Sequence, residues 1–246
     1  MIFAVVLAGG SGKRFGGDTP KQYRELFGKP VIAWSLQAFE KSSADGIVLV
    51  CAEKDIEYCR RDIVEKYGIS KCKAIVPGGE NRYDSVYCGL KAAAELAGEL
   101  HENEHFCMIH DGARPCIDTD TVNEAADYVV TSGSCVVGVK VTDTIQIVND
   151  AGDICMTPDR AHTWAAQTPQ CFELSNALNS YKEAVENRDE TITDDASAVR
   201  KYGSGSIYML QGKKENIKIT TEDDLQTAEK ILRERLKENR VSFLKA

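Results

Sequence analysis

Short apolar runs alternate with longer amphipathic segments along most of the chain, and this alternation most constrains the fold. The apolar runs are rich in β-branched residues, so they predict strands that are buried on both faces of a sheet. The expected strands are Ile2–Leu7, Ile47–Cys51, Lys73–Val76, Phe106–His110, Cys135–Val141, Ile207–Leu210 and Ile217–Thr220. The expected helices are Val31–Phe39, Asp55–Tyr67, Tyr83–Leu96, Thr119–Val130, Leu174–Glu186, Asp195–Lys201 and Glu222–Glu238. This order of elements predicts an α/β fold with a mostly parallel, Rossmann-like sheet covered by helices on both faces.

Residues 139–170 break this alternation, because they show no helical period. Two alternating arms, Thr144–Val148 and Ile154–Met156, flank the turn-forming segment Asn149–Asp153, which predicts a β-hairpin. A hairpin that protrudes from a sheet leaves edges and apolar side chains uncovered, so we expect a second copy of the chain to pair with it. The alternative is a hairpin folded back on its own domain. We therefore expect one domain over residues 1–246, with a dimerisation arm at about residues 139–160.

Charge and composition argue against several classes of protein. The formal net charge of −8 argues against non-specific binding to nucleic acid. No apolar stretch approaches the ~20 residues that a transmembrane helix needs, and the first apolar run is too short for a signal peptide. The nine cysteines include no Cys-x-x-Cys pair, which favours buried thiols in a reducing compartment over a disulfide framework or a zinc site. We expect a cytoplasmic protein without nucleic-acid or membrane partners.

A glycine-rich, basic loop, LAGGSGKRFG at residues 7–16, follows the first expected strand, where parallel α/β sheets bind ligands. It is not a Walker A loop, because Leu7 occupies the position of the first glycine and Arg14 that of the Ser or Thr. The dinucleotide-binding fingerprint fails at Phe15, so an oxidoreductase is a remote alternative. Arg14 and Lys21 can instead stabilise the charge that develops when an α-phosphorus is attacked. A merely solvated basic loop is the alternative.

A second polar cluster, HDGARP at residues 110–115, follows the strand Phe106–His110 and should lie at the same edge of the sheet. Asp111 is a natural Mg²⁺ ligand, because Mg²⁺ usually takes one or two carboxylates together with substrate oxygens and water. Arg114 adds a bidentate phosphate donor. The alternative is an Asp111–Arg114 ion pair that only closes the loop.

Four further motifs carry weaker signals. The segment GGENRYDSV opens a helix and can present Ser85 to a base or ribose, while its Arg82 is readily explained as a surface charge. Arg160 can hold the phosphate of a second substrate, and Lys218 can meet a phosphate if its strand face is the ligand face. The segment TDDAS, which contains Asp195, is fully explained by helix capping.

Taken in order from Leu7 to Thr220, these motifs resemble the 2-C-methyl-D-erythritol 4-phosphate cytidylyltransferases of the non-mevalonate isoprenoid pathway. The matching segments are LAGGSGKRFG, PKQ, GGENRYDSV, HDGARP, DTI, QTPQ, TDDAS and NIKIT. One departure is Gly112, where the family usually has alanine. The resemblance implies a fold of the nucleotide-diphospho-sugar transferase type. It also implies transfer of CMP from CTP to 2-C-methyl-D-erythritol 4-phosphate, giving 4-diphosphocytidyl-2-C-methylerythritol and pyrophosphate.

The resemblance further implies roles for particular residues. Arg14 and Lys21 would stabilise the transition state, and Asp111 would bind Mg²⁺. Residues from two loops would line the cytidine pocket, namely Ala8, Gly9, Gly10, Gly79, Glu80 and Ser85. Acceptor contacts would come from Arg160, Lys218, Arg114 and Thr142. The family forms homodimers in which the arm of one chain helps to form the active site of the other.

Two rival functions stay open on the sequence. The ribitol 5-phosphate cytidylyltransferases, which make CDP-ribitol, share the loop, the hairpin and QTPQ, but tend to have Val-Arg-Pro where this chain has Ala113-Arg114-Pro115. A non-catalytic nucleotide sensor is the rival from another class. Against a sensor stand Arg14 and Lys21, because a sensor needs no fixed cations at the α-phosphate.

Overall fold

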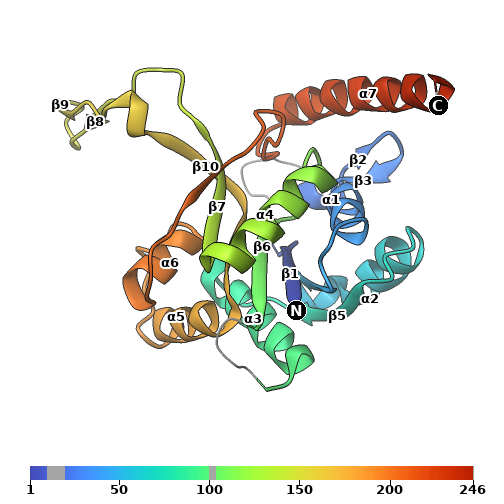
Figure 1. The fold of residues 1–246 in the computed structure, drawn as a ribbon, viewed down its shortest axis with the longest axis horizontal. Helices are drawn as coiled ribbons and strands as arrows, with labels where there is room; N and C mark the ends of the chain where they lie inside the picture. Colours follow the sequence, from blue (N-terminus) through green and yellow to red (C-terminus); the bar gives the residue numbers. More distant parts are fainter. Residues whose placement is uncertain (10–19, 100–103, 246) are drawn as a thin grey trace.

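The computed structural model describes residues 1–9, 20–99 and 104–245, and its centre is a sheet in the strand order β11-β7-β10-β6-β1-β4-β5 (Figure 1). Every pairing in this sheet is parallel except those of β10, which runs antiparallel to both β6 and β7. The strands are β1 (Ile2–Leu7), β4 (Gly46–Cys51), β5 (Cys72–Pro77), β6 (Phe106–Asp111), β7 (Ser134–Lys140), β10 (Trp164–Glu173) and β11 (Met209–Gln211). The predicted mostly parallel α/β sheet is confirmed.

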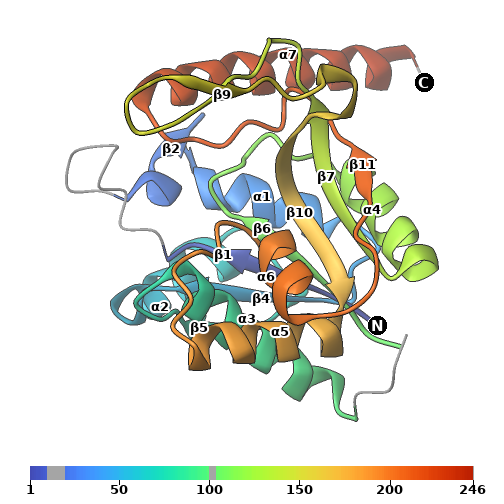
Figure 2. The ribbon, with the colours of Figure 1, turned by 90° about the vertical axis from the view of Figure 1, so that its left-hand side faces the viewer.

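Helices cover both faces of the sheet, as the apolar strands require (Figure 2). One face carries α3 (Arg82–Ala97), α5 (Leu174–Glu186) and α6 (Asp195–Tyr202). The other carries α1 (Val31–Glu40), α4 (Thr119–Ser132) and an irregular segment made of a 3₁₀ turn (Glu53–Asp55), α2 (Ile56–Tyr58) and the π-helical η3 (Cys59–Glu65). Successive residues of β1 point to opposite faces of the sheet. Phe3 and Val5 therefore pack into the core on the α3 side, whereas Ala4 and Val6 pack into the core on the α1 side.

The C-terminal helix α7 (Glu222–Lys245) packs beside the small β2–β3 hairpin (Glu25–Leu26 and Lys29–Pro30). A third apolar cluster joins them, formed by Leu26, Val31, Cys116, Ile219, Ala228 and Leu232. Arg235 ties the helix to the loop after β6, because its Nη2 donates to the Cys116 carbonyl at 3.0 Å. Among the described residues, no helix combines the length and apolar character needed to cross a membrane.

Two predictions about strands were wrong. Strand β10 was not expected, because the Gln167–Gln170 segment is polar and contains a proline, which is normally excluded from the interior of a sheet. The structure accommodates Pro169 at a shift of register between Ala166 and Gln170. In contrast, residues 217–220 were expected to form a strand but are irregular. Ile219 is anchored by its N–H, which donates to the Ala113 carbonyl at 2.8 Å, and by its buried side chain.

The predicted hairpin is confirmed, although its first arm is shorter than expected. It consists of β8 (Ile147–Val148) and β9 (Ile154–Met156), and it projects away from the sheet (Figures 1 and 2). Its turn is closed by Asn149 Oδ1, which accepts the Asp153 N–H at 2.9 Å. Four apolar side chains of the hairpin are 43–64% exposed: Ile147, Val148, Ile154 and Met156. Its role as a dimerisation arm stays a prediction.

Candidate active site

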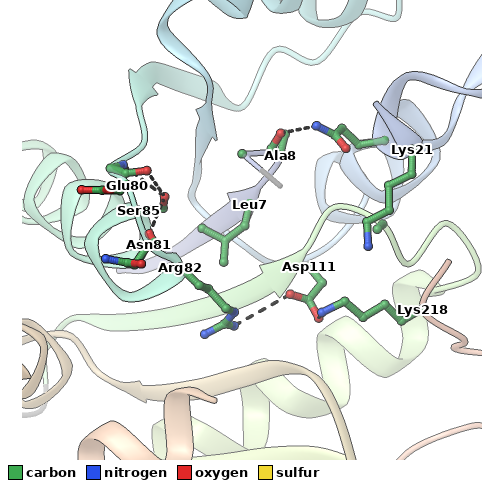
Figure 3. A pocket seen from close by; sticks show the side chains of 13 residues that line it. Leu7, Ala8, Lys21, Glu80, Asn81, Arg82, Ser85, Asp111 and Lys218 are labelled. Carbon is green, nitrogen blue, oxygen red and sulfur yellow. Dashed lines mark hydrogen bonds and ion pairs between the residues drawn. The ribbon is translucent and has the colours of Figure 1, made fainter. Parts of the chain in front are cut away.

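A pocket of about 320 Å³ lies beyond the carboxyl ends of β1 and β6, beside the first turn of α3 (Figure 3). Its wall combines the loop after β1, the short helical turn η1 (Lys21–Tyr23), the loop before α3 and a segment before α7. The lining residues are Leu7, Ala8, Gly9, Lys21, Gln22, Gly79, Glu80, Asn81, Arg82, Ser85, Asp111, Ala113 and Lys218. The described part of the loop after β1, residues 7–9, therefore meets Asp111 and Ala113 of the second polar cluster in one pocket.

The loop before α3 packs closely onto the first turn of the helix. Ser85 Oγ accepts the Gly79 N–H at 3.1 Å and donates to the Asn81 carbonyl at 3.1 Å. A Cβ atom on Gly79 would lie 2.3 Å from the Asp84 Cβ, so only glycine allows this approach. Asn81, Arg82 and Ser85 line the pocket, so the positive dipole end of α3 lies beside it and favours an anionic or polar ligand.

Lys21 is held at the pocket by its neighbour Gln22, a residue to which the sequence analysis assigned no role. The Gln22 side chain is buried, and its Nε2 donates to the Ala8 carbonyl at 2.6 Å. This hydrogen bond ties η1 to the end of β1, so Lys21 and Ala8 line the same cavity (Figure 3). Both Lys21 and Gln22 of the Pro-Lys-Gln motif therefore line the pocket, and Gln22 also anchors η1 to the end of β1.

Asp111, the last residue of β6, lies at the pocket floor among three cationic side chains. Its Oδ2 is 2.9 Å from Lys218 Nζ and 3.5 Å from Arg114 Nε. Its Oδ1 is 3.8 Å from Arg82 Nη2, beyond hydrogen-bond distance. Burial alone would raise the pKa of Asp111, but these cations hold it well below its ordinary value. Asp111 is therefore ionised throughout the physiological range of pH.

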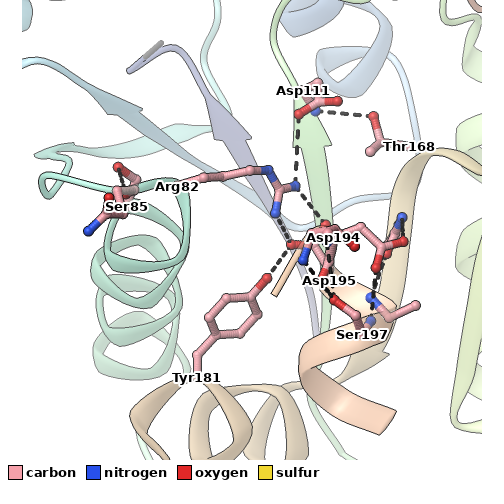
Figure 4. Close-up of polar contacts among 12 residues, drawn as sticks. Arg82, Ser85, Asp111, Thr168, Tyr181, Asp194, Asp195 and Ser197 are labelled. Atoms are coloured by element: carbon pink, nitrogen blue, oxygen red, sulfur yellow. Dashed lines mark hydrogen bonds and ion pairs between the residues drawn. The ribbon is translucent and has the colours of Figure 1, made fainter. Parts of the chain in front are cut away.

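Arg82 is a pocket residue that the sequence analysis misjudged as a surface charge. Its Nη1 and Nη2 donate to the two carboxylate oxygens of Asp195 at 2.8 and 2.9 Å (Figure 4). Asp195 is fully buried and also accepts a hydrogen bond from the Tyr181 hydroxyl. Helix capping, which was thought to explain all of TDDAS, describes Asp194 and Ser197 but not Asp195. Asp194 Oδ1 accepts the Ser197 N–H at 2.9 Å, and Ser197 Oγ accepts the Asp194 N–H at 3.1 Å.

Gly112, the departure noted in the HDGARP motif, is explained by its neighbours. An added Cβ atom would lie 2.2 Å from Ile32 Cδ1 and 2.8 Å from the Leu7 carbonyl oxygen. The Ile32 side chain of α1 therefore occupies the space that an alanine methyl group would need. The Gly112 N–H also donates to the Leu7 carbonyl at 2.9 Å, which joins the end of β1 to the loop after β6.

The neighbouring His110 is completely buried and supports the backbone of Asp111. Thr168 Oγ1 accepts the Asp111 N–H at 3.1 Å and lies 3.0 Å from His110 Nδ1. The Thr168 hydroxyl can therefore donate its proton to Nδ1 of a neutral imidazole. Burial lowers the pKa of His110 from 6.5 to about 3. The imidazole is therefore neutral in the folded protein across the range in which an unfolded histidine becomes protonated.

This burial predicts a specific dependence of stability on pH. Between pH 6.5 and about 3 the unfolded chain binds a proton at His110 that the folded chain does not, so stability is lost as the pH falls. As the pH falls through this window, the free energy of unfolding of the His110→Gln variant should decrease by about 1.4 kcal/mol less per pH unit than that of the wild type. Urea unfolding at several pH values measures this difference, and equal slopes would contradict it. His162→Gln, at an exposed histidine, is the control.

The structure brings most of the predicted site residues together but separates two of them. Ala8, Gly9, Lys21, Gly79, Glu80, Ser85, Asp111 and Lys218 line the pocket. Arg114 lies behind Asp111 and donates from Nη1 to the Asn216 carbonyl at 2.8 Å. Arg160 and Thr142 lie on the exposed arm, where Arg160 Nη1 donates to the Thr142 carbonyl at 3.2 Å. Gly10 and Arg14 lie outside the described residues.

Comparison with known proteins identifies the family. The family model of 2-C-methyl-D-erythritol 4-phosphate cytidylyltransferase matches residues 2–234. The chain belongs to this family. A member from Lachnoclostridium phytofermentans is 40% identical over 233 residues, covering 95% of this chain and 97% of that protein. A member from Lachnospira eligens is 41% identical over 230 residues, covering 93% and 97% respectively.

Solved structures of the family share the fold. The 4-diphosphocytidyl-2C-methyl-D-erythritol synthase of Anaerococcus prevotii matches with a TM-score of 0.79 and 26% identity, covering 94% of this chain and 96% of that one. The 2-C-methyl-D-erythritol 4-phosphate cytidylyltransferase of Francisella tularensis matches with a TM-score of 0.73 and 26% identity, covering 94% and 99%. The resemblance found in the sequence motifs is therefore confirmed at the level of the family and of the fold.

Proposed function

We propose that this chain transfers CMP from CTP to 2-C-methyl-D-erythritol 4-phosphate, with release of pyrophosphate. The observation that carries the proposal is the convergence of Lys21, Arg82 and Lys218 with Asp111 in one pocket, at the edge where α/β sheets bind nucleotides. Membership of the cytidylyltransferase family supports the choice of nucleotide and acceptor. A cytoplasmic location stays a prediction, supported by nine cysteines that are all free thiols.

In the proposed reaction, an oxygen of the acceptor phosphate attacks the α-phosphorus of CTP and the bond to pyrophosphate breaks in line. The acceptor phosphate is already ionised, so no strong general base is required. Catalysis then depends on positioning and on fixed positive charge at the reacting oxygens. Lys21 and Arg14 would stabilise the charge that develops at the α-phosphate, and Lys218 would position the acceptor.

The nucleotide would lie across the first turn of α3. Gly79, Glu80 and Ser85 line this part of the pocket together with Gly9. Glu80 and Ser85 lie across the pocket from Ala8 (Figure 3). The family resemblance assigns Gly10 to the same pocket. Small residues on both sides leave room for a flat base, and the N-terminus of α3 supplies N–H donors.

A divalent cation fits this pocket only in combination with the substrate. Among the described residues, no group of three or more His, Cys, Asp or Glu side chains is placed to hold a metal ion. Asp111 supplies one carboxylate, and its Oδ1 lies 3.8 Å from Arg82 Nη2, beyond hydrogen-bond distance. One carboxylate, with triphosphate oxygens and water, is a coordination that suits Mg²⁺. A bound Mg²⁺ would neutralise charge on the triphosphate, while Asp111 would hold it.

The arm would complete the site of a second chain. Arg160 and Thr142 are exposed and do not line the pocket of their own chain in the described structure. The exposed apolar side chains of β8 and β9 are the kind of surface that a second copy covers. We propose a homodimer in which the arm of one chain brings Arg160 and Thr142 to the acceptor in the pocket of its partner.

The choice of acceptor is tested by measuring pyrophosphate release from CTP with each of two polyol phosphates. We expect turnover with 2-C-methyl-D-erythritol 4-phosphate to be faster than with ribitol 5-phosphate at equal concentrations. Faster turnover with ribitol 5-phosphate would replace the proposed acceptor. No release with either acceptor, despite binding of CTP, would support the nucleotide sensor instead.

A further inference from the structure

Arg82 connects two carboxylates that lie at different depths in the protein. Both of its terminal nitrogens donate to the fully buried Asp195, and Nη2 is also 3.8 Å from Asp111 Oδ1 (Figure 4). The Arg82 side chain is 33% exposed, so it reaches from the buried interior into the pocket. Burial opposes the charge of the guanidinium, but Asp195 raises the pKa of Arg82 well above its ordinary value. Arg82 therefore carries a permanent charge in a fixed place.

Tyr181 and Asp195 restrict the movement of this guanidinium. A bidentate pair between a planar fork and a carboxylate fixes the orientation of both groups. The Tyr181 hydroxyl, on α5, holds one oxygen of Asp195, which is the first residue of α6. Burial, together with the charge of Asp195, keeps the pKa of Tyr181 well above its ordinary value, so the hydroxyl stays a donor. Side chains from three helices thus determine where Arg82 Nη2 lies.

We propose that Asp195 and Tyr181 are positioning residues, which hold Arg82 Nη2 beside Asp111 and so orient this carboxylate and place positive charge at the triphosphate subsite. The proposal rests on the proposed function, because it assigns a task within the same nucleotide pocket. Within the described part of the chain, the pocket wall includes Arg82 and Asp111 but neither Asp195 nor Tyr181. Asp195 and Tyr181 would therefore act on the reaction only through Arg82.

The competing explanation is that the Arg82–Asp195 pair only joins α3 to α6. Removing one partner of a buried ion pair leaves an uncompensated charge, so single substitutions destabilise a protein under either explanation. Removing both charges together avoids that penalty and is often close to neutral for stability. The double variant Arg82→Met with Asp195→Asn therefore separates a structural role from a positioning role.

We expect the single variants Arg82→Met and Asp195→Asn to unfold at lower temperature than the wild type, and the double variant to recover most of that loss. The double variant should nevertheless keep a kcat/KM for CTP about 10- to 100-fold below the wild type, the usual effect of losing a group that orients a ligand-binding carboxylate. The single variant Arg82→Lys keeps the charge but loses the planar fork, so its kcat/KM should lie between those of Arg82→Met and the wild type. Tyr181→Phe should lower kcat/KM less than Asp195→Asn.

A Lys–Asp–Tyr cluster that joins α6 to the segment between α5 and α6 provides a matched control. Lys201 Nζ lies 2.5 Å from Asp189 Oδ2, which also accepts the Tyr202 hydroxyl at 2.9 Å. This cluster lies outside the pocket wall. The double variant Lys201→Met with Asp189→Asn should therefore keep the kcat/KM of the wild type. Recovery of both unfolding temperature and kcat/KM in the Arg82→Met, Asp195→Asn variant would show that the pair is structural only, and would overturn the proposal.

Calorimetric binding of CTP, with and without Mg²⁺, gives a readout that does not depend on turnover. We expect the Arg82→Met, Asp195→Asn variant to bind CTP more weakly than the wild type and to need more Mg²⁺ for half-maximal binding. If the variant and the wild type bind CTP with equal affinity and need equal amounts of Mg²⁺, the proposal is contradicted. This test holds even if the wild type turns over neither acceptor. Absence of turnover by the wild type, with CTP still bound more tightly than by the variant, would remove the proposed function and leave the positioning role standing.

Discussion

Replacing Lys21 with alanine is expected to lower kcat by about 10²- to 10³-fold, the effect of removing one fixed donor from a developing oxyanion. The lysine lines the pocket opposite Asp111 and is held there by Gln22, whose side chain donates to the Ala8 carbonyl at 2.6 Å (Figure 3). A charge that is fixed before the reaction stabilises the transition state without reorganisation. The affinity for CTP should change by about tenfold at most, because a partly exposed charge contributes little to ground-state binding.

Rapid-quench measurement of CMP transfer, together with calorimetric binding of CTP, separates these two effects. Lys54→Ala is the matched control, because Lys54 is an exposed lysine on the 3₁₀ turn Glu53–Asp55, outside the pocket wall. This control should retain the activity of the wild type. Equal losses of turnover and of CTP affinity in Lys21→Ala would indicate that the lysine serves binding alone, as in a nucleotide sensor.

Much of the fold was predictable because its elements are buried on a regular period. Strand β1 and helix α5 have the predicted bounds, Ile2–Leu7 and Leu174–Glu186. Their apolar side chains are in contact with the two main cores, so the hydrophobic pattern and the tertiary structure agree. Strand β10 carries no such pattern. Its central residues are polar and include Pro169, and only its position between β6 and β7 makes it a strand.

The site was predictable where its residues follow strand ends, and it was missed where they depend on distant contacts. Ala8, Gly9 and Asp111 come directly after β1 or at the end of β6, so the parallel sheet itself brings them to one edge. Arg82 and Asp195 are separated by 113 residues, and each has a sufficient local explanation, as a surface charge or as part of a helix cap. Only the packing of α3 against α5, and of α5 against α6, shows that they form one buried pair.

The positions of Lys21 and Arg160 place a geometric requirement on the proposed reaction. Lys21 lines the pocket, whereas Arg160 is exposed on the arm beside Thr142 and is not part of the pocket wall of its own chain. A phosphate acceptor that contacts both residues therefore needs an arm from a second chain. Each complete site would then combine Lys21 of one chain with Arg160 of the other, as symmetric pairing of identical chains allows.

Mixing two inactive variants should therefore restore activity. Arg160→Ala alone is expected to lower kcat/KM by about 10²-fold through loss of a charge-assisted phosphate contact. When Lys21→Ala and Arg160→Ala chains are coexpressed, half of the randomly formed dimers contain both, and each of these has one intact site. The mixture should thus reach about a quarter of the wild-type activity.

The control for this experiment mixes Lys21→Ala with the double variant Lys21→Ala, Arg160→Ala, which provides no intact site in any dimer and should stay at background. Differently tagged chains, purified in tandem, isolate the mixed dimers, which should have about half of the wild-type activity. Background activity in tandem-purified mixed dimers would show that Arg160 does not act across the interface. The purified mixed dimers would still prove that the two chains associate. This result would therefore mean that the arm joins the chains without supplying Arg160 to the acceptor site.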